Sequence, residues 1–189
     1  HQVVRCDVPP NHPPSLSRGG RGALRRQATR PAAGRLAYCW TMTSQASPLE
    51  LGAHVDQADP IAEAQARGAR IVQHFIGNPQ SWQAPAVAYP GGPAALKQAA
   101  EQAGIGIYVH APYVINVAST NNRIRIPSRK LLQQQVTAAA AIGARGVIVH
   151  GGHVGAGDDL LAGYENWFKA VDGLGLECPI FIENTAGGA

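Results

Sequence analysis

The feature that most constrains this chain is a regular alternation of short apolar runs and helical segments from residue 49 onward. The apolar runs cover residues 49–55, 70–76, 105–111, 146–151 and 179–185. Segments with helical patterns lie between them, at residues 61–67, 93–103, 127–142 and 158–174. The runs are continuously apolar, which is typical of parallel strands covered on both faces. The repeated strand–helix units therefore predict an α/β protein with a parallel sheet.

Prolines and glycines mark the expected helix boundaries. The first three helices are expected to open at Pro60, Pro93 and Pro127. They are expected to close at Gly68, Gly104 and Gly143. Proline favours the first helical position because its missing N–H has no partner there, and glycine favours the position just past the end. Asp59, immediately before Pro60, is the expected N-cap of the first helix.

Polar side chains follow the strands where each one ends. They are His54, His74 with Asn78, His110, His150 and Glu183. Polar groups at the carboxyl ends of successive parallel strands are the arrangement of a TIM barrel. A doubly wound nucleotide-binding sheet more often has a glycine-rich phosphate turn after its first strand. The turn AHVDQADP contains no such motif, so the sequence predicts a TIM (β/α)8 barrel.

The predicted barrel is incomplete. A full barrel of this type needs about 250 residues and eight strands. Residues 42–189 supply only the five strands named above. We therefore expect them to be the N-terminal part of a TIM-barrel domain, truncated to about five strand–helix units and incomplete at the C-terminus. An open sheet of this kind would leave an unpaired edge.

The first 41 residues differ in composition from the rest. They carry seven arginines against one acidic residue, Asp7, whereas residues 42–189 carry 9 basic and 11 acidic side chains. The segment is rich in Pro, Gly, Arg and Ser without a helical or strand period, which indicates a disordered basic arm. Because Met42 is the only methionine, we interpret residues 1–41 as upstream sequence read in frame with a gene that starts at Met42. A nucleic-acid-binding tail and a transit peptide are the alternatives.

Composition also bears on the compartment. No stretch is long and apolar enough to span a membrane, and the N-terminal region lacks the apolar segment of a secretory signal. The three cysteines, Cys6, Cys39 and Cys178, show no motif spacing. Such sparse cysteines suit a reducing compartment, so we expect a cytoplasmic protein with no membrane partner.

Three of the strand ends together suggest a metal site. His110, His150 and Glu183 end consecutive strands, which a barrel would place side by side on one rim. Two imidazoles and a carboxylate suit a zinc site with a fourth position open for water, and bound zinc lowers the pKa of that water. A single histidine at a strand end is more often structural, but the coincidence on three strands favours a metal. His54 and His153 are candidates to support the ligands without touching the ion.

A resemblance runs along the same part of the chain. The segments GAHV (52–55), NPQSW (78–82), HAPYVINVAS (110–119), IPSRKLL (126–132), VIVHGGH (147–153) and IENTAGG (182–188) occur in that order. Together they resemble the endonuclease IV family of apurinic/apyrimidinic endonucleases. The resemblance covers almost all of residues 50–189 and none of the arm.

The resemblance implies a monomeric base-excision-repair enzyme with three zinc ions, acting on damaged double-stranded DNA in the bacterial cytoplasm, at the nucleoid. Such an enzyme hydrolyses the phosphodiester 5′ to an abasic site and leaves a 3′-hydroxyl. His110 and His150 then correspond to ligands of the first zinc, and Glu183 to the catalytic carboxylate that bridges the first and second. The other zinc ligands of the family come from strands six to eight, which would follow Ala189.

The family also presses loop residues into the DNA. Tyr113 matches the wedge tyrosine, since an aromatic ring can fill the gap left by an extruded nucleotide. Asn78 and Asn116 are candidate phosphate donors. Gln80 stands where many members have arginine, and a neutral side chain there departs from the family's wedge.

Two other functions remain open from sequence. A sugar-phosphate isomerase or epimerase of a similar barrel also holds a divalent metal with Glu and His at strand ends. NPQSW and Tyr113 favour the nuclease, because a small sugar needs no wedge. The chain could instead be a non-catalytic fragment, or its arm could bind nucleic acid nonspecifically. We expect the 189-residue chain to be inactive and marginally folded by itself.

Overall fold

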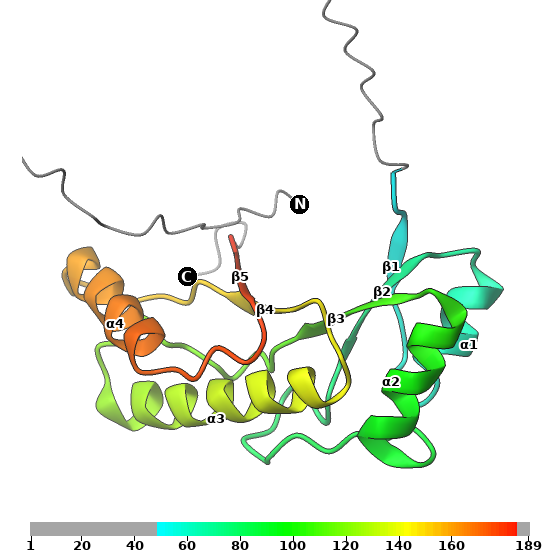
Figure 1. The fold of residues 1–189 in the computed structure, drawn as a ribbon. Helices are drawn as coiled ribbons and strands as arrows, with labels where there is room; N and C mark the ends of the chain where they lie inside the picture. The colour runs from blue at the N-terminus through cyan, green and yellow to red at the C-terminus, as the bar shows by residue number, and fades with distance from the viewer. Residues whose placement is uncertain (1–48, 185–189) are drawn as a thin grey trace, which may run out of the picture. The chain divides into compact units, whose positions relative to one another are not determined.

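The predicted apolar runs form parallel strands of one sheet in a computed structural model that describes residues 49–184 (Figure 1). The strands are β1 (Gly52–His54), β2 (Ile71–Phe75), β3 (Gly106–His110), β4 (Gly146–His150) and β5 (Ile180–Glu183). The helices between them are α1 (Pro60–Ala66), α2 (Gly92–Ala103), α3 (Asn122–Ala141) and α4 (Leu160–Asp172). The strands lie side by side in chain order. The described residues therefore confirm the expected architecture, a TIM barrel present as a five-stranded part.

Several expectations fall outside the described residues. They concern the disordered basic arm at residues 1–41, the start at Met42 with the domain boundary it sets, and the end of the last strand at residue 185. Within residues 49–184, no helix combines the length and the apolar character that crossing a bilayer requires.

The cap of α1 forms as the sequence predicts. Asp59 precedes the helix, and its Oδ1 accepts a hydrogen bond of 3.0 Å from the backbone N–H of Ala62. Pro60 is the first helical residue, and Gly68 follows the helix with a φ of 63°. A left-handed backbone of this kind is costly for any residue with a Cβ atom, so the glycine ends the helix as expected. Gly104 and Gly143 close α2 and α3 with the same φ sign.

The start of α3 differs from the prediction. We expected Pro127 to open the helix, but α3 begins at Asn122 and contains Pro127 in its interior. Asn121 is the N-cap, and its Oδ1 accepts from the N–H of Arg123 at 2.9 Å. Asparagine can cap because its side chain replaces a missing backbone partner. The helix tolerates the proline at the cost of one backbone hydrogen bond, and the neighbouring Ser128 hydroxyl donates to the Ile124 carbonyl.

The strands are staggered along the sheet. Phe75 pairs with His110, His110 pairs with Ile148, and His150 pairs with Glu183. Moving from β3 to β4 therefore shifts the pairing so that His150 lies two residues beyond the partner of His110. A stagger between neighbouring strands is what closes a sheet into a barrel.

The two faces of the sheet are covered differently. Residues of the outer face, such as Val72, Val109 and Val149, are fully buried beneath the helices. On the inner face Tyr108, Ile148 and Phe181 are only half-buried. Among the described residues, the expectation of cover on both faces therefore holds only for the outer face of β2, β3 and β4, since Ile182 in β5 is 42% exposed. The inner face of a barrel is buried only by a closed ring of strands. Figure 1 shows the helices along one side of the sheet.

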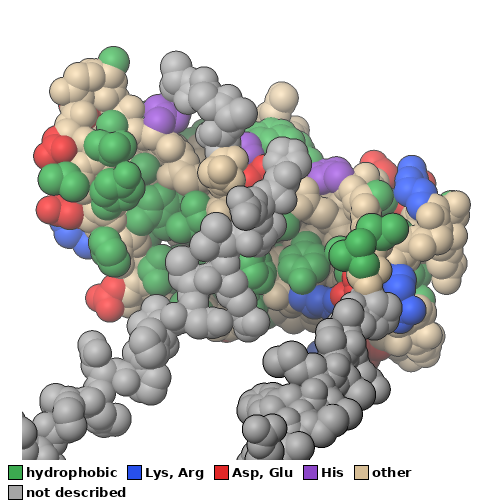
Figure 2. All heavy atoms as spheres, turned by 90° about the horizontal axis from the view of Figure 1, so that it is seen from above, with side chains coloured by type: hydrophobic (Ala, Val, Ile, Leu, Met, Phe, Trp, Pro, Cys, Tyr) green, Lys and Arg blue, Asp and Glu red, His purple; other side chains and the backbone are tan. Residues whose placement is uncertain are grey.

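Apolar surface is exposed on the inner face of the sheet and along α4, among other places in the described part. A hollow of about 410 Å³ lies on the inner face and is lined by Ile71, Tyr108, Ile148 and Phe181 among others. Large apolar side chains are also exposed along α4, where Figure 2 shows hydrophobic side chains gathered. They are Leu160, Leu161, Tyr164, Phe168 and Val171. Exposed apolar surface of this extent marks a place where further chain or a partner is expected to pack.

Truncating a core leucine should cost far more stability than truncating an exposed one. Leu132 in α3 is 0% exposed, and Leu161 in α4 is 63% exposed. We expect Leu132→Ala to lower the free energy of unfolding by about 2–5 kcal/mol. Leu161→Ala should change it by no more than about 0.5 kcal/mol. Urea titration followed by circular dichroism measures both, and equal losses would contradict the burial described here.

Candidate metal centre

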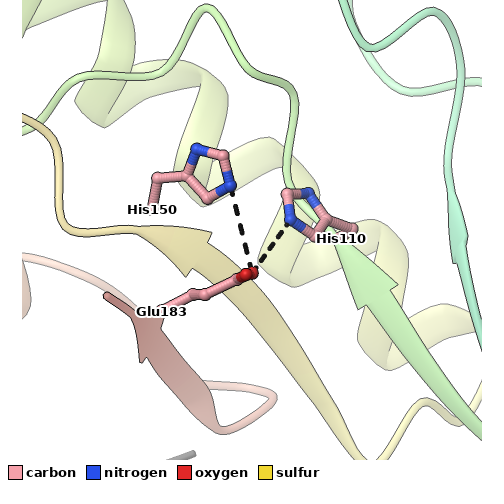
Figure 3. A group of neighbouring side chains, drawn as sticks. All are labelled: His110, His150 and Glu183. Carbon is pink, nitrogen blue, oxygen red and sulfur yellow. Dashed lines mark hydrogen bonds and ion pairs between the residues drawn. The ribbon is translucent and has the colours of Figure 1, made fainter. Parts of the chain in front are cut away.

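Three side chains from successive strands meet at the carboxyl end of the sheet. His110 ends β3, His150 ends β4 and Glu183 ends β5, and the three point toward one another (Figure 3). Nε2 of His110 lies 3.3 Å from Oε2 of Glu183, and Nε2 of His150 lies 3.9 Å from the same oxygen. One possible ligand atom from each residue falls within 4.8 Å of the others. The structure thus brings together the three residues that the sequence predicted to share a site.

The backbone fixes which nitrogen of His110 faces the group. Nδ1 of His110 lies 2.7 Å from the carbonyl oxygen of Ala111, so Nδ1–H is the donor of this contact. In the neutral form of the ring the lone pair then lies on Nε2, the atom that faces Glu183. His110 is buried, with 5% of its surface exposed. A metal-binding histidine commonly has its other nitrogen hydrogen-bonded in this way, since the bond fixes the ring and its tautomer.

Strand pairing places the other two members. His150 and Glu183 are direct partners in the β4–β5 register. Just past the pair, the N–H of Gly151 donates to the carbonyl oxygen of Glu183 at 3.1 Å. Side chains of paired residues lie on the same face of a sheet. The imidazole and the carboxylate are therefore held over the inner face, two residues beyond the hollow lined by Ile148 and Phe181.

The donor set fits zinc. Ligand atoms about 2.0–2.1 Å from a tetrahedral ion lie about 3.3 Å from one another. The His110–Glu183 distance is 3.3 Å, and the widest separation in the group is below 4.8 Å. Small movements of two half-buried side chains would close the difference. Nitrogen and carboxylate ligands in this number also match sites that keep one position for water.

The charge state of His150 suits metal binding. Burial lowers the pKa of His150, and the neighbouring His110 lowers it further, while Glu183 acts in the opposite direction. Burial and a like charge both disfavour the charged form of an imidazole. His150 is therefore neutral at pH 7, and its Nε2 can act as a ligand without first releasing a proton.

Aromatic rings surround the group. Phe75 lies 5.2 Å from the ring of His110 and 5.3 Å from that of Tyr113, measured between ring centroids. Tyr113 in turn lies 5.5 Å from His110 and 5.6 Å from His150, yet 53% of its surface is exposed. Phe75 escaped the sequence analysis because an apolar residue in a strand looks like ordinary core. No local sequence signal could have found it, because its position opposite His110 emerges only from the strand register.

His54 lies beside the group rather than in it. Its ring centroid is 6.4 Å from that of His110, and its Nδ1 lies 2.9 Å from Nε2 of Gln73. Burial lowers the pKa of His54, and the nearby His110 contributes in the same direction. This placement suits the supporting role expected from the sequence.

His74 does not belong to the rim, although we grouped it with the strand-end residues. Its side chain is 2% exposed and lies on the outer face of β2, where alternate residues are buried. Nδ1 of His74 lies 2.8 Å from the Phe75 carbonyl oxygen, and burial is the largest cause that lowers its pKa. The alternation of side chains along a strand sends His74 to the helix side and Phe75 to the site side.

The loops at this rim are hydrogen-bonded to one another. The side-chain oxygen of Gln57, after β1, accepts from the N–H of Gly77, after β2, at 2.7 Å. The carbonyl oxygen of Pro79, after β2, accepts from the N–H of Tyr113, after β3, at 2.8 Å. Each loop is therefore positioned by the next one around the sheet.

The candidate DNA-contacting residues are placed differently from one another. Asn78 and Gln80 are exposed, and Oδ1 of Asn78 accepts from the N–H of Gln80 at 2.9 Å. Asn116 is only 8% exposed, and its amide is hydrogen-bonded to the backbone of His153. His153 lies in the loop after β4 and is exposed. Tyr113, Asn78 and Gln80 are thus open to a ligand at the rim, whereas the Asn116 amide already has partners within the protein.

Comparison with known proteins finds relatives across this part of the chain. The family model described as xylose isomerase-like TIM barrel matches residues 61–188. Proteins named probable endonuclease 4 from Mycobacterium ulcerans and Mycobacterium tuberculosis are 56% identical over 138 residues, 73% of this chain and 52% of each relative. The Mycobacterium leprae protein of the same name is 52% identical over the same length. The chain spans about half the length of the curated relatives it matches.

Solved structures show the same similarity of fold. Endonuclease IV from Thermus thermophilus superimposes with a TM-score of 0.62 at 27% identity, over 75% of this chain and 54% of that one. A D-tagatose 3-epimerase-like protein superimposes with a TM-score of 0.56 at 16% identity, over 74% of this chain and 54% of that one. The second likeness concerns the fold alone.

The neighbours of His150 should be visible in its titration. In the metal-free protein, NMR of the imidazole protons should give a pKa for His150 below the usual 6.5. Glu183→Gln removes a negative charge that favours the imidazolium, so the pKa should fall further. His110→Ala removes a like charge, so the pKa should rise. The control Glu165→Gln, on the exposed face of α4, should leave it unchanged. A rise in Glu183→Gln would contradict the geometry.

Proposed function

The chain belongs to the xylose isomerase-like TIM barrel family and, within it, to endonuclease IV, and on this premise we propose that it is the metal-binding part of an apurinic/apyrimidinic endonuclease. The proposed reaction is hydrolysis of the phosphodiester on the 5′ side of an abasic site in duplex DNA, which leaves a 3′-hydroxyl. The product would serve base excision repair. The proposed setting is the bacterial cytoplasm.

One observation carries the proposal. His110, His150 and Glu183 offer two imidazole nitrogens and a carboxylate oxygen within 4.8 Å of one another, on the ends of three adjacent parallel strands. This is the rim at which TIM barrels hold their catalytic groups. The same three residues are those to which the endonuclease IV resemblance assigns zinc.

The proposed roles follow from the placement of each side chain. Zinc bound at such a site supplies Lewis-acid chemistry and eases the ionisation of water near pH 7. His110 and His150 would hold the ion through Nε2. Glu183 would be the third ligand and, through its two oxygens, the bridge toward a second ion. Its negative charge also offsets the cost of placing a cation beside the buried His110.

The exposed rim residues are proposed to contact DNA. Tyr113 projects beside the group with 53% of its surface exposed, and Phe75 packs against its ring from within the sheet. A supported, exposed aromatic ring can stack in the gap of an abasic site. Asn78 and Gln80 follow β2 on the adjoining loop, which the Tyr113 N–H contacts at Pro79. Neutral amides there can donate to phosphate oxygens.

We also propose that the 189-residue chain does not cleave DNA by itself. The described residues offer one three-ligand group, whereas the resemblance implies three zinc ions. Among these residues the inner face of the sheet is half-exposed and β1 and β5 are each paired on one side only. A catalytic unit would need more ligands and a covered interior.

A sugar isomerase or epimerase is the alternative hypothesis, and no contact among the described residues favours it. The epimerase-like structure shares the fold at 16% identity, which concerns architecture rather than activity. The exposed Tyr113 beside the metal group favours a polymeric substrate. Turnover of ketoses by the protein, without cleavage of DNA, would favour the epimerase over the nuclease.

Zinc binding tests the ligand set directly. We expect the chain to bind one Zn²⁺ in competition with a chromogenic chelator. His110→Ala, His150→Ala and Glu183→Gln should each weaken binding by about a hundredfold or more, since each removes one of three coordinate bonds. Glu165→Gln, which changes an exposed carboxylate on α4, is the matched control. Unchanged affinity in all three variants would refute the ligand assignment.

A chimera tests the reaction. The 138 residues of the Mycobacterium tuberculosis relative that match this chain are replaced by the corresponding residues of this chain. We expect the chimera to nick a duplex with one abasic site on its 5′ side, giving an end that a polymerase extends. The Glu183→Gln chimera should nick the abasic duplex at least about a thousandfold more slowly, as expected for a group that stabilises transition-state charge. A chimera that folds and binds zinc but does not nick would remove the nuclease proposal.

A further inference from the structure

Asn116 joins two loops of the rim through its side chain. Its Nδ2 donates to the carbonyl oxygen of His153 at 2.9 Å, and its Oδ1 accepts from the N–H of His153 at 3.1 Å. Both polar ends of one amide thus pair with both polar groups of one backbone residue. Asn116 lies in the loop between β3 and α3, and His153 lies in the loop between β4 and α4. We call this paired contact the rim clamp.

The Asn116 side of the rim clamp is itself held in place. The backbone N–H of Asn116 donates to Oγ of Ser128 at 2.9 Å, and this hydroxyl donates to the carbonyl oxygen of Ile124 at 2.8 Å. Ser128 is 0% exposed in α3. The backbone of Asn116 is therefore anchored to α3. Its side chain has fewer conformations to lose when the clamp forms.

The His153 side requires a glycine. Gly152 has a φ of 73°, and a Cβ atom at this position would overlap Oδ1 of Asn116. Any side chain there would meet both a strained backbone and the clamp itself. The second glycine of the GGH segment after β4 is therefore explained by the rim clamp, which the sequence pattern alone did not reveal.

Helix α4 also contacts the same two loops. The indole N–H of Trp167 donates to the carbonyl oxygen of Gly151 at 2.7 Å. Nδ2 of Asn166 donates to the carbonyl oxygens of Ala118 and Ser119, at 3.1 and 3.0 Å. Two contacts therefore hold the chain directly after His150, one from α4 to Gly151 and one from Asn116 to His153.

We propose that Asn116 is a positioning residue, which fixes the loop after β4 and thereby sets the direction of the His150 imidazole for metal binding. His150 is followed by two glycines, and a glycine pair leaves the backbone free unless something outside it decides its course. Gly151 is held by its hydrogen bonds to Glu183 and Trp167, and the rim clamp fixes the next step of the chain, from Gly152 to His153. The consequence for metal affinity rests on the proposed function, whereas the consequence for the loop does not.

This role replaces the direct DNA contact expected for Asn116 from the sequence. The side chain is 8% exposed, and the backbone of His153 occupies its carbonyl oxygen and its amino group. The inference predicts that removing the amide changes the loop and the metal site in the absence of any DNA.

Hydrogen exchange in the metal-free chain tests the clamp. Asn116→Ala should speed the exchange of the His153 amide at least about tenfold, because this N–H loses its acceptor. The Gly151 amide, which donates to Glu183, should speed up as well, while the Val147 amide, paired with Pro179 within the sheet, should not change. Asn122→Ala, which alters an exposed asparagine bonded only within α3, is the matched control.

Zinc affinity of the same variants tests the positioning. Asn116→Ala should weaken zinc binding about 10- to 100-fold, the usual effect of losing a residue that orients a ligand. Asn116→Asp keeps the acceptor for the His153 N–H and loses the donor, so its affinity should lie between those of Asn116→Ala and the unaltered chain. The d–d absorption of bound Co²⁺ should also shift, which a change in stability alone would not cause. The urea midpoint, measured in parallel, separates these effects from unfolding.

A double-mutant cycle makes the test decisive. Gly152→Ala should weaken zinc binding less in Asn116→Ala than in the unaltered chain, because the overlap with Oδ1 has then gone and only the backbone strain remains. Additive effects, or unchanged exchange at His153 in Asn116→Ala, would overturn the proposal. If Asn116→Ala does not fold, Asn116→Asp decides by the same readouts. An unaltered chain that binds no zinc would instead refute the proposed function, while the exchange result would still decide whether the clamp exists.

Discussion

The parallel pairing of β3, β4 and β5 is the interaction on which the candidate site depends. Residues more than seventy positions apart become neighbours only because these strands pair in a fixed register, with His150 opposite Glu183 and His110 one step of stagger behind. The side-chain period of a strand is two, so a slip of one residue would send a ligand to the helix side. The buried outer face, with Val109 and Val149, specifies that register. The core therefore sets the chemistry at the rim.

The rim adds precision that strand pairing alone does not supply. A strand fixes where a Cα atom lies, whereas a ligand also needs a defined ring direction. The Nδ1 contact of His110 to its neighbouring carbonyl and the aromatic packing of Phe75 provide that direction for one ligand. Contacts between loops extend the same order to the exposed Tyr113. A site built in this way combines a rigid base with an open upper surface, which suits a large substrate.

Much of this arrangement could be predicted from the sequence because its signals are local. The apolar runs, the glycine helix ends and the polar strand ends each depend on a few neighbouring residues. Two predictions were wrong because one local signal was given more weight than another. Pro127 looked like a helix start, but Asn121 caps the helix earlier through the N–H of Arg123. His74 looked like the other strand-end residues, but the alternation of side chains along β2 places it beneath the helices. The partner of Asn116 lies in another loop, so no local pattern could reveal it.

The alternation of side chains along each strand also has an evolutionary consequence. Loops of this barrel can lengthen or shorten without rotating any strand, because each loop begins after the last paired residue. Strands lack this freedom: inserting one residue before His110 within β3 would exchange the site side and the helix side for every residue that follows. Homologues that keep the metal site but act on a different substrate are therefore expected to differ by insertions in the loops after the strands. The number of residues from a buried outer-face valine to the ligand should stay odd, as it is from Val109 to His110 and from Val147 to His150.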